Sequence, residues 1–193
     1  RNHRQAKIVD DQGISLGPNK VGRLMLKGPG MMKGYFQDQQ ASQKAFQGKW
    51  FDTGDLALID NKGFLYHRGR TKDMIRRSGE NISAVEVESV LNQHPLLIAS
   101  GVIPVRDDLR EEEVFAILEP KNKVENETEF FVELSKHCEE NLAKFKIPRY
   151  WKLVQKLPLT ASERVSKKEL KSDDYTKIVF DSKTGEVVDR VEV

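Results

Sequence analysis

The residues of this chain best suited to bind a nucleotide are an aspartate and an arginine in two short polar segments. Asp55 ends the segment 50–55, Trp-Phe-Asp-Thr-Gly-Asp, and Arg70 lies near the start of the segment 69–75, Gly-Arg-Thr-Lys-Asp-Met-Ile. A carboxylate on a tight turn can accept hydrogen bonds from two ribose hydroxyls, and a fixed guanidinium can hold a phosphate. The same residues could instead be an ordinary turn aspartate and a surface ion-pair partner, which are commoner roles.

The sequence pattern changes near residue 71. Before that point, residues 6–10 run into Asp-Gln-Gly, and residues 56–60 turn through Asn-Lys-Gly into residues 64–66. Short apolar runs that are joined by turns of Asp, Asn and Gly are typical of β-hairpins. We therefore expect residues 1–71 to be rich in β-hairpins.

Helix signals appear only in the rest of the chain. Ser83 and Glu86 have the spacing of a capping box, so we expect a helix that opens there and ends before Pro95. Apolar residues recur at helical spacing after Asn126, which predicts a second helix that ends before Pro148.

Three apolar runs predict buried strands, at residues 102–105, 114–118 and 151–155. With the two helices they indicate a small α+β domain, a three-stranded sheet with helices, over residues 72–171. The remaining residues, 172–193, are expected to be a tail whose strand-like runs around Ser-Lys-Thr-Gly favour a β-hairpin.

Composition narrows the class of protein but does not identify a partner. The chain has 193 residues, of which 38% are hydrophobic and 32% charged, enough to bury one core or two small ones. A net charge of +2 is too balanced to indicate a nucleic-acid or membrane surface. The sequence contains no apolar run long enough to span a membrane and no apolar stretch typical of a signal peptide, so we expect no membrane partner.

The single cysteine, Cys138, permits no intrachain disulfide. Its helical spacing from Phe131, Leu134 and Leu142 predicts a buried side chain, and a reducing cytoplasm is the expected location. The four histidines have no metal-ligand spacing, so no metal site is expected in this chain.

The segments 50–55, 69–75 and 78–82 together resemble core motifs of the adenylate-forming (AMP-binding) superfamily, the acyl-CoA synthetases and their relatives. The resemblance extends from about residue 6 to residue 170, and residues 75–82 are most similar to the carnitine- and crotonobetaine-type CoA ligases. It implies the β-rich end of a large N-terminal domain followed by a mobile C-terminal domain, so we expect the chain to be a fragment.

The resemblance assigns roles to residues near this junction. It implies that Asp55 binds the ribose hydroxyls, that Arg70 contacts the same nucleotide, and that Lys72 is the hinge between the two domains. It also implies a loop that lines the pantetheine tunnel of coenzyme A, with the candidate residues Ser78, Gly79 and Glu80.

A second CoA-binding region is implied by Phe145, Lys146 and Arg149, which resemble the place where related ligases hold the nucleotide part of CoA. An aromatic ring beside cations suits a phosphorylated adenosine. These residues could equally be a core phenylalanine and cations that are favoured at a helix C-terminus.

Residues 160–170 resemble the family's Thr-x-x-Gly-Lys-x-x-Lys-x-x-Leu loop, with two departures. Glu163 stands where glycine is usual, and Arg164 stands where the family has the lysine that bridges the substrate carboxylate and the α-phosphate. The resemblance therefore implies Arg164 as the catalytic residue. Another cation can partly fill an electrostatic role, but a planar guanidinium cannot place a single point charge as an ammonium does. An exposed basic loop is the alternative.

The implied function is part of an ATP-dependent carboxylic acid:CoA ligase, which forms an acyl-adenylate and pyrophosphate, then acyl-CoA and AMP. The implied ligands are ATP, Mg²⁺, CoA and a small carboxylic acid, and the implied partner is the rest of the N-terminal domain. The phosphate loop, the acyl pocket and the Mg²⁺ ligand are expected outside this chain, so we expect the chain alone to be inactive.

Three other functions stay open. An adenylation domain that loads a carrier protein would share the motifs, although no Gly-Gly-x-Ser carrier segment follows Leu170. A non-catalytic or adenylation-impaired nucleotide-binding homologue is favoured by Arg164. A nucleic-acid module is the weakest alternative, because the 32 basic residues are matched by 30 acidic ones.

Overall fold

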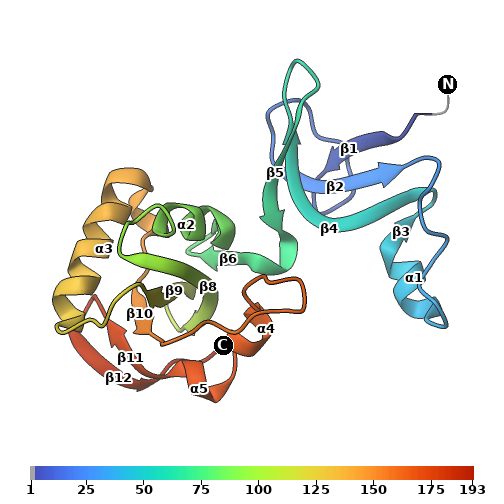
Figure 1. Ribbon diagram of the computed structural model, residues 1–193. Coiled ribbons are helices and arrows are strands. Elements are labelled where there is room, and N and C mark those ends of the chain that lie inside the picture. Colours follow the sequence, from blue (N-terminus) through green and yellow to red (C-terminus); the bar gives the residue numbers. More distant parts are fainter. Residues whose placement is uncertain (1–2) are drawn as a thin grey trace. The chain divides into compact units, whose positions relative to one another are not determined.

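The computed structural model describes residues 3–193 and divides the chain into two compact units, Arg1–Lys72 and Asp73–Val193. Both can be followed from blue to red in Figure 1. The sequence pattern predicts a boundary between residues 71 and 72, where the β-hairpin-rich part ends and the α+β domain begins. None of the helices among the described residues has the length and apolar character needed to cross a bilayer.

The first unit is built on a five-stranded antiparallel sheet, with strand order β1-β2-β4-β3 and β5 paired to β4. Its strands are β1 (Gln5–Val9), β2 (Gly22–Lys27), β3 (Phe46–Gln47), β4 (Trp50–Ile59) and β5 (Leu65–Arg70), and its helix is α1 (Gln39–Ala45). The small core of this unit contains Ile8, Leu24 and Ala57. The β-hairpin-rich character expected of this part is therefore confirmed.

An aspartate closes the turn of the β4–β5 hairpin. Asp60 Oδ1 accepts hydrogen bonds from the backbone N–H groups of Lys62 and Phe64, both at 2.9 Å. Gly63 has a φ of 84°, which favours glycine. This local chemistry explains why the Asp-Asn-Lys-Gly sequence predicts the turn correctly.

The second unit contains a seven-stranded sheet of order β12-β11-β10-β9-β6-β7, with β8 paired to β9. Its strands are β6 (Met74–Arg77), β7 (Glu80–Ser83), β8 (Leu97–Asp107), β9 (Glu111–Pro120), β10 (Tyr150–Leu153), β11 (Lys177–Asp181) and β12 (Glu186–Arg190). Its helical segments are η1 (Thr71–Asp73, shared with the end of the first unit), α2 (Ala84–Leu91), α3 (Glu127–Asn141), η2 (Lys144–Lys146), α4 (Lys167–Leu170) and α5 (Asp173–Thr176).

The α+β class is confirmed, but the expected three-stranded sheet is too small. The three predicted strands coincide with parts of β8, β9 and β10, and the hairpins β6–β7 and β11–β12 extend the sheet. The β6 and β7 strands are short and polar, so their sequences carry no apolar strand signal. The expected tail, residues 172–193, joins the sheet because β11 pairs with β10 and the ring of Phe180 stacks on Phe131 at 5.2 Å.

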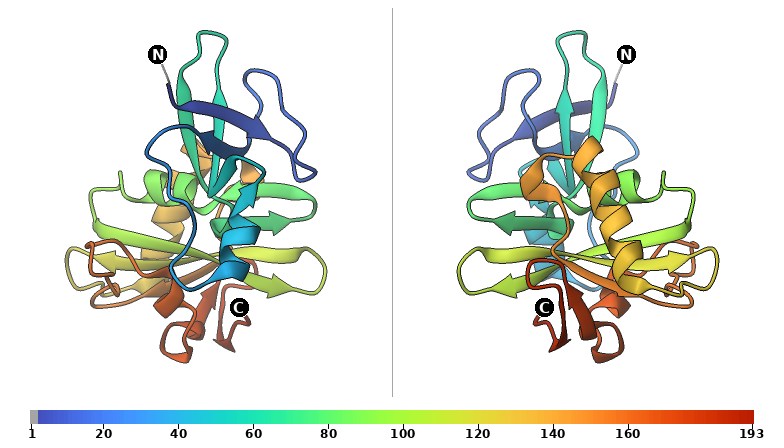
Figure 2. Two further views of the ribbon diagram at one scale, coloured as in Figure 1. Left: turned by 90° about the vertical axis from the view of Figure 1, so that its right-hand side faces the viewer. Right: turned by 90° about the vertical axis from the view of Figure 1, so that its left-hand side faces the viewer.

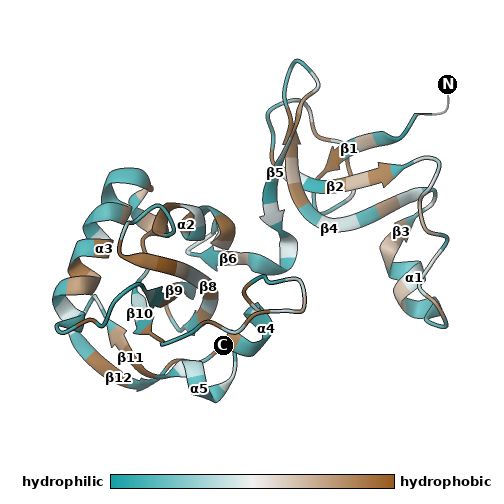
Figure 3. Ribbon diagram, viewed as in Figure 1, coloured by the Kyte–Doolittle hydropathy of each residue, from teal (hydrophilic) through white to brown (hydrophobic). Residues whose placement is uncertain are grey.

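The sheet of the second unit is covered on both faces. Alternating residues of β9 point to opposite sides: Ala116 packs in the core with α2 and α3, and Phe115 packs in the core with Leu170 of α4. Figure 2 shows α3 lying across one face. Figure 3 shows α3 alternating between teal and brown, as expected of a helix with one buried side.

Both predicted helices are present, the first with its predicted cap at Ser83 and the second starting next to Asn126, which also caps it. Ser83 Oγ accepts from the N–H of Glu86 at 3.4 Å, and Asn126 Oδ1 accepts from the N–H of Glu129 at 3.2 Å. Cys138 of α3 is fully buried, as predicted, and burial raises the pKa of its thiol to about 12.

The packing of α4 on β8 gives a test of this fold. A methyl group added at Gly101 would lie 2.4 Å from Leu170 Cδ1 and 3.0 Å from Val165 Cγ1. We expect Gly101→Ala to destabilise the second unit by about 1–3 kcal/mol, because Leu170 is fully buried and must move. Hydrogen exchange of the β8 and β9 amides measures this loss. Gly17→Ala, where nothing lies within 4 Å, is the matched control and should leave exchange unchanged.

Candidate functional site

The Thr-Gly-Asp sequence forms a β-bulge in β4. Residues 53–55 lie opposite a single residue of β2, Leu24, where the register of the two strands shifts. Thr53 Oγ1 donates to the carbonyl of Leu24 at 3.0 Å and accepts from the N–H of Asp55 at 3.0 Å. Gly54 has a φ of 71°, which a side chain would strain. The bulge therefore fixes the backbone from which the Asp55 carboxylate projects.

Asp52, rather than Asp55, supplies the turn hydrogen bond of this motif. Its Oδ1 accepts from the N–H of Gly54 at 2.9 Å, and its Oδ2 forms an ion pair with Arg23 of β2. Each of these two charged side chains is only 18% exposed. This arrangement leaves the carboxylate of Asp55 available for other partners. The sequence pattern gave no signal for Arg23, except that it is a charge within an apolar strand.

The two predicted nucleotide-binding residues lie together. Asp55 and Arg70 are opposite each other on β4 and β5, and Arg70 Nε donates to Asp55 Oδ1 at 3.0 Å. His67 Nε2 lies 3.8 Å from the same oxygen, a neighbour that the sequence did not indicate. The Arg70 side chain is 64% exposed and that of Asp55 is 26% exposed, so a ligand can reach both.

Lys72 lies in the short 3₁₀ turn η1 and is the last residue of the first unit. Its side chain is exposed. Its neighbour Asp73 belongs to the second unit, where Lys167 Nζ lies 4.0 Å from Asp73 Oδ2 and 3.0 Å from Glu88 Oε1. Burial raises the pKa of Glu88, which also accepts from the N–H of Val102. The role of Lys72 as a hinge stays a prediction.

Ser78 and Gly79 form the two-residue turn between β6 and β7. Their φ angles are 51° and 81°, the positive values that a tight hairpin of this kind requires. The N–H of Ser78 donates to the carbonyl of Arg110 at 2.9 Å, which ties the turn to the neighbouring hairpin. The side chains of Ser78 and Glu80 are exposed to solvent.

Phe145 and Lys146 lie side by side on η2. Lys146 Nζ is 5.7 Å from the centre of the Phe145 ring, and it forms an ion pair with Glu86 Oε1 of α2 at 2.6 Å. Phe145 packs against the core beneath α2 and α3. An anionic ligand at Lys146 would compete with Glu86 for the ammonium group.

Arg149, the third predicted residue of this region, is engaged inside the protein. Its Nη1 donates to Asp107 at 2.7 Å and its Nη2 donates to Asp181 at 2.8 Å, and its side chain is only 16% exposed. The hydrogen bonds to Asp181 raise the pKa of Arg149. A ligand could use this guanidinium only by displacing a carboxylate. Arg149 is held by two carboxylates, those of Asp107 and Asp181, whereas Lys146 is held by one.

Arg164 lies in a short loop that is closed by a bridge between Leu159 and Val165. The N–H of Thr160 donates to the carbonyl of Arg164 at 2.7 Å, and the N–H of Glu163 donates to the carbonyl of Thr160 at 2.9 Å. The Arg164 side chain is exposed. Glu163 has a φ of 58°, a left-handed conformation that favours glycine. The glycine that the resembled motif has at this position would adopt the conformation without strain.

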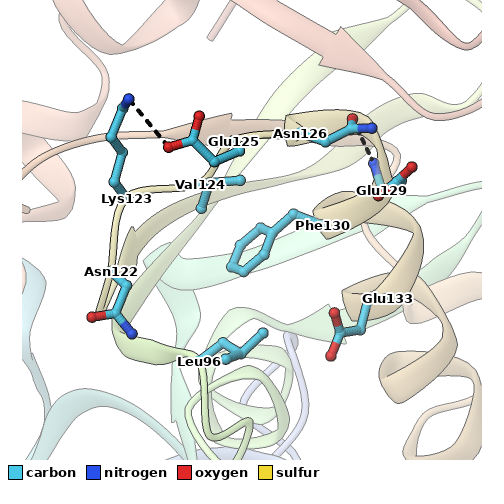
Figure 4. A pocket seen from close by; sticks show the side chains of 9 residues that line it. All are labelled: Leu96, Asn122, Lys123, Val124, Glu125, Asn126, Glu129, Phe130 and Glu133. Carbon is cyan, nitrogen blue, oxygen red and sulfur yellow. Dashed lines mark hydrogen bonds and ion pairs between the residues drawn. The ribbon is translucent and has the colours of Figure 1, made fainter.

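The pocket in Figure 4 is lined by other residues, all of them in the second unit. It has a volume of about 320 Å³ and lies where the loop before α3 meets the start of that helix. Glu125, Glu129 and Glu133 line it, and its one lysine, Lys123, forms an ion pair with Glu125 at 3.2 Å. This acidic lining does not suit the phosphates of a nucleotide. None of the candidate site residues named above lines this pocket.

The AMP-binding enzyme C-terminal domain matches residues 86–164. This stretch of the chain is therefore similar to the C-terminal domain of AMP-binding enzymes. The matched residues lie in the second unit and include the loop around Arg164. The α+β architecture of the second unit agrees with this similarity.

The proteins that this chain is similar to include several CoA ligases. The chain is 37% identical over 173 residues to a crotonobetaine/carnitine–CoA ligase of Salmonella arizonae, with 86% of this chain and 32% of that protein covered. It is 38% identical over 163 residues to a 2-succinylbenzoate–CoA ligase of Bacillus subtilis, with 84% of this chain and 32% of that protein covered.

A solved structure supports the same relationship. The o-succinylbenzoate CoA synthetase of Bacillus subtilis, in complex with its acyl-adenylate intermediate, has a TM-score of 0.80 and 38% identity, covering 88% of this chain and 34% of that one. The same enzyme has been solved with ATP and a magnesium ion. The chain thus spans about a third of the length of the relatives that it matches.

The Asp55–Arg70 pair gives a test of the nucleotide site. In the full-length protein, we expect Asp55→Ala to weaken ATP binding by about 1.5–3 kcal/mol, the contribution of hydrogen bonds to a charged acceptor. Equilibrium titration with ATP measures the change. Asp11→Ala, at an exposed aspartate of the first unit, is the control. Unchanged ATP affinity in Asp55→Ala would show that this carboxylate only orders Arg70.

Proposed function

We propose that this chain is part of an ATP-dependent carboxylic acid:CoA ligase. The enzyme would join the acid to AMP with release of pyrophosphate, and would then transfer the acyl group to the thiol of CoA with release of AMP. The observation that carries this proposal is the Asp55 carboxylate, fixed by its bulge beside the guanidinium of Arg70, in a chain 37% identical to a CoA ligase.

Asp55 and Arg70 would hold the nucleotide throughout both reactions. The carboxylate oxygens of Asp55 accept hydrogen bonds from ribose hydroxyls, and the exposed Arg70 donates to the same nucleotide. Their mutual contact of 3.0 Å orients both groups before the ligand arrives, which lowers the entropy lost on binding. A bound Mg²⁺ would offset phosphate charge, and we expect its ligand outside this chain.

The second unit would serve the two reactions in two orientations, turning about Lys72. The exposed 3₁₀ turn that contains Lys72, at the boundary between the two compact units, supports this proposal. A change of orientation lets one nucleotide site meet Arg164 during adenylation and the Ser78–Gly79 turn during thioester formation. Each orientation would shield the reactive mixed anhydride from water.

The CoA thiol would arrive past the turn of Ser78, Gly79 and Glu80, with the CoA nucleotide near Phe145 and Lys146. The exposure of the turn and the pairing of an aromatic ring with a cation support these positions. A reducing cytoplasm is the proposed location, which a single buried cysteine suits.

An adenylation-impaired nucleotide-binding homologue is the second candidate. Two neighbouring features favour it. Arg164 stands where the resemblance implies a lysine whose role depends on a compact charge, and Glu163 takes a left-handed conformation without being glycine. Such a protein would bind ATP through Asp55 and Arg70 but would activate no acid.

Substitution of Arg164 separates the two candidates. We expect Arg164→Lys to raise the rate of pyrophosphate exchange into ATP, because a compact ammonium fits between a carboxylate and an α-phosphate. We expect Arg164→Ala to lower that rate by about a hundredfold, the loss typical when one group that stabilises developing charge is removed. Thioester formation from preformed acyl-adenylate should change little in either variant.

Lys168→Ala, at an exposed cation of α4, is the matched control for these variants and should exchange pyrophosphate like the wild type. Equal exchange rates in the Lys and Ala variants of Arg164 would mean that this arginine is a solvated surface charge. Absence of exchange in the wild type and in Arg164→Lys, with every acid tested, would favour the adenylation-impaired homologue.

The proposed hinge at Lys72 can be tested separately. Lys72→Pro fixes φ at this residue, so we expect it to slow thioester formation at least about tenfold while pyrophosphate exchange is largely kept. Single-turnover assays of the two half-reactions measure the effect. Lys72→Ala removes the cation but leaves the backbone free, and it should slow neither step by as much. If Lys72→Pro slows both half-reactions equally, Lys72 is not the hinge.

A further inference from the structure

One half-buried arginine links the two segments that are proposed to bind CoA. Arg77, at the end of β6, immediately precedes the Ser78–Gly79 turn. Its Nη1 donates to the carbonyl of Phe145 on η2 at 2.6 Å. Arg77 and Phe145 are 68 residues apart in the sequence, and the guanidinium of Arg77 is a direct polar link between the two segments.

The other side of the Arg77 guanidinium is held by Glu113 of β9. Arg77 Nε lies 2.6 Å from Glu113 Oε2, and Nη2 donates to Glu113 Oε1 at 3.2 Å. Glu113 is fully buried, and Arg110 contacts it at 2.7 Å. Two contacts with a buried carboxylate, one hydrogen bond and one close ion pair, leave the guanidinium little freedom to rotate. The remaining nitrogen, Nη1, is therefore aimed at η2.

Arg77 cannot itself be a ligand of CoA in this arrangement. Its side chain is only 14% exposed, and its nitrogens are engaged by Glu113 and by the carbonyl of Phe145. Its effect on a ligand would instead come from the position that it gives to Phe145 and Lys146 relative to the turn at Ser78.

We propose that Arg77 is a positioning residue for CoA, which holds the Phe145–Lys146 segment in place relative to the Ser78–Gly79 turn. This inference rests on the proposed function. Glu113 supports Arg77 in this role by fixing the orientation of its guanidinium. The part of CoA that depends on Arg77 is the phosphorylated nucleotide, because the thiol arm lies at the turn.

The test uses Arg77→Lys in the full-length ligase, because a lysine keeps the charge beside Glu113 but cannot hold Glu113 and the Phe145 carbonyl together. We expect KM for CoA to rise about tenfold, as for the loss of one charge-assisted hydrogen bond. The kcat at saturating CoA and the rate of pyrophosphate exchange should stay within about twofold of wild type, which also shows that the variant is folded. KM for pantetheine, a thiol without the nucleotide, should not change.

Arg106→Lys is the matched control, since Arg106 lies in the same sheet with an exposed side chain. A KM for CoA in Arg77→Lys that is within twofold of this control overturns the inference. So does an equal rise in KM for pantetheine, or a fall in pyrophosphate exchange, because either would indicate general damage. If the wild-type ligase makes acyl-adenylate but no CoA thioester, the proposed function fails, and the inference fails with it.

Discussion

The second unit depends on one buried carboxylate. Glu113 is completely shielded from solvent in the middle of the sheet, and three arginines approach it, Arg77, Arg110 and Arg149, at 2.6, 2.7 and 3.8 Å. A charge in such a place is tolerated only while its partners remain, because an uncompensated buried ion costs several kcal/mol. These arginines come from three separate parts of the chain. The carboxylate therefore makes the positions of those parts depend on one another.

Asp52 and Asp55 of the first unit have different roles. Asp52 closes the turn and binds Arg23, so it stabilises the bulge from within. Asp55 makes no such turn contact with its carboxylate, which faces Arg70 and His67 instead. Two aspartates three residues apart in one motif thus have different tasks, one structural and one suited to a ligand. The bulge separates them by turning the strand between them.

Local features of this fold could be predicted from the sequence, and long-range ones could not. The cap at Ser83 depends on neighbouring residues, so spacing alone predicted it, and helical spacing also predicted that the second helix starts near Asn126. The Asp55–Arg70 pair followed from a family motif. The size of the sheet was missed, because β6 and β7 are short polar strands whose pairing depends on contacts distant in the sequence. The engagement of Arg149 was missed for the same reason, since its partner Asp181 lies 32 residues away.

The burial of Cys138 has a practical consequence for measuring motion. The chain contains no other cysteine, and a thiol that is fully buried with a pKa near 12 carries almost no thiolate at neutral pH. Maleimide and other thiol-specific dyes would therefore leave the native chain almost unlabelled. A cysteine introduced at an exposed position such as Leu109, which is 90% exposed, would take up a fluorophore selectively. The natural cysteine would therefore not need to be removed before the chain is labelled for single-molecule spectroscopy.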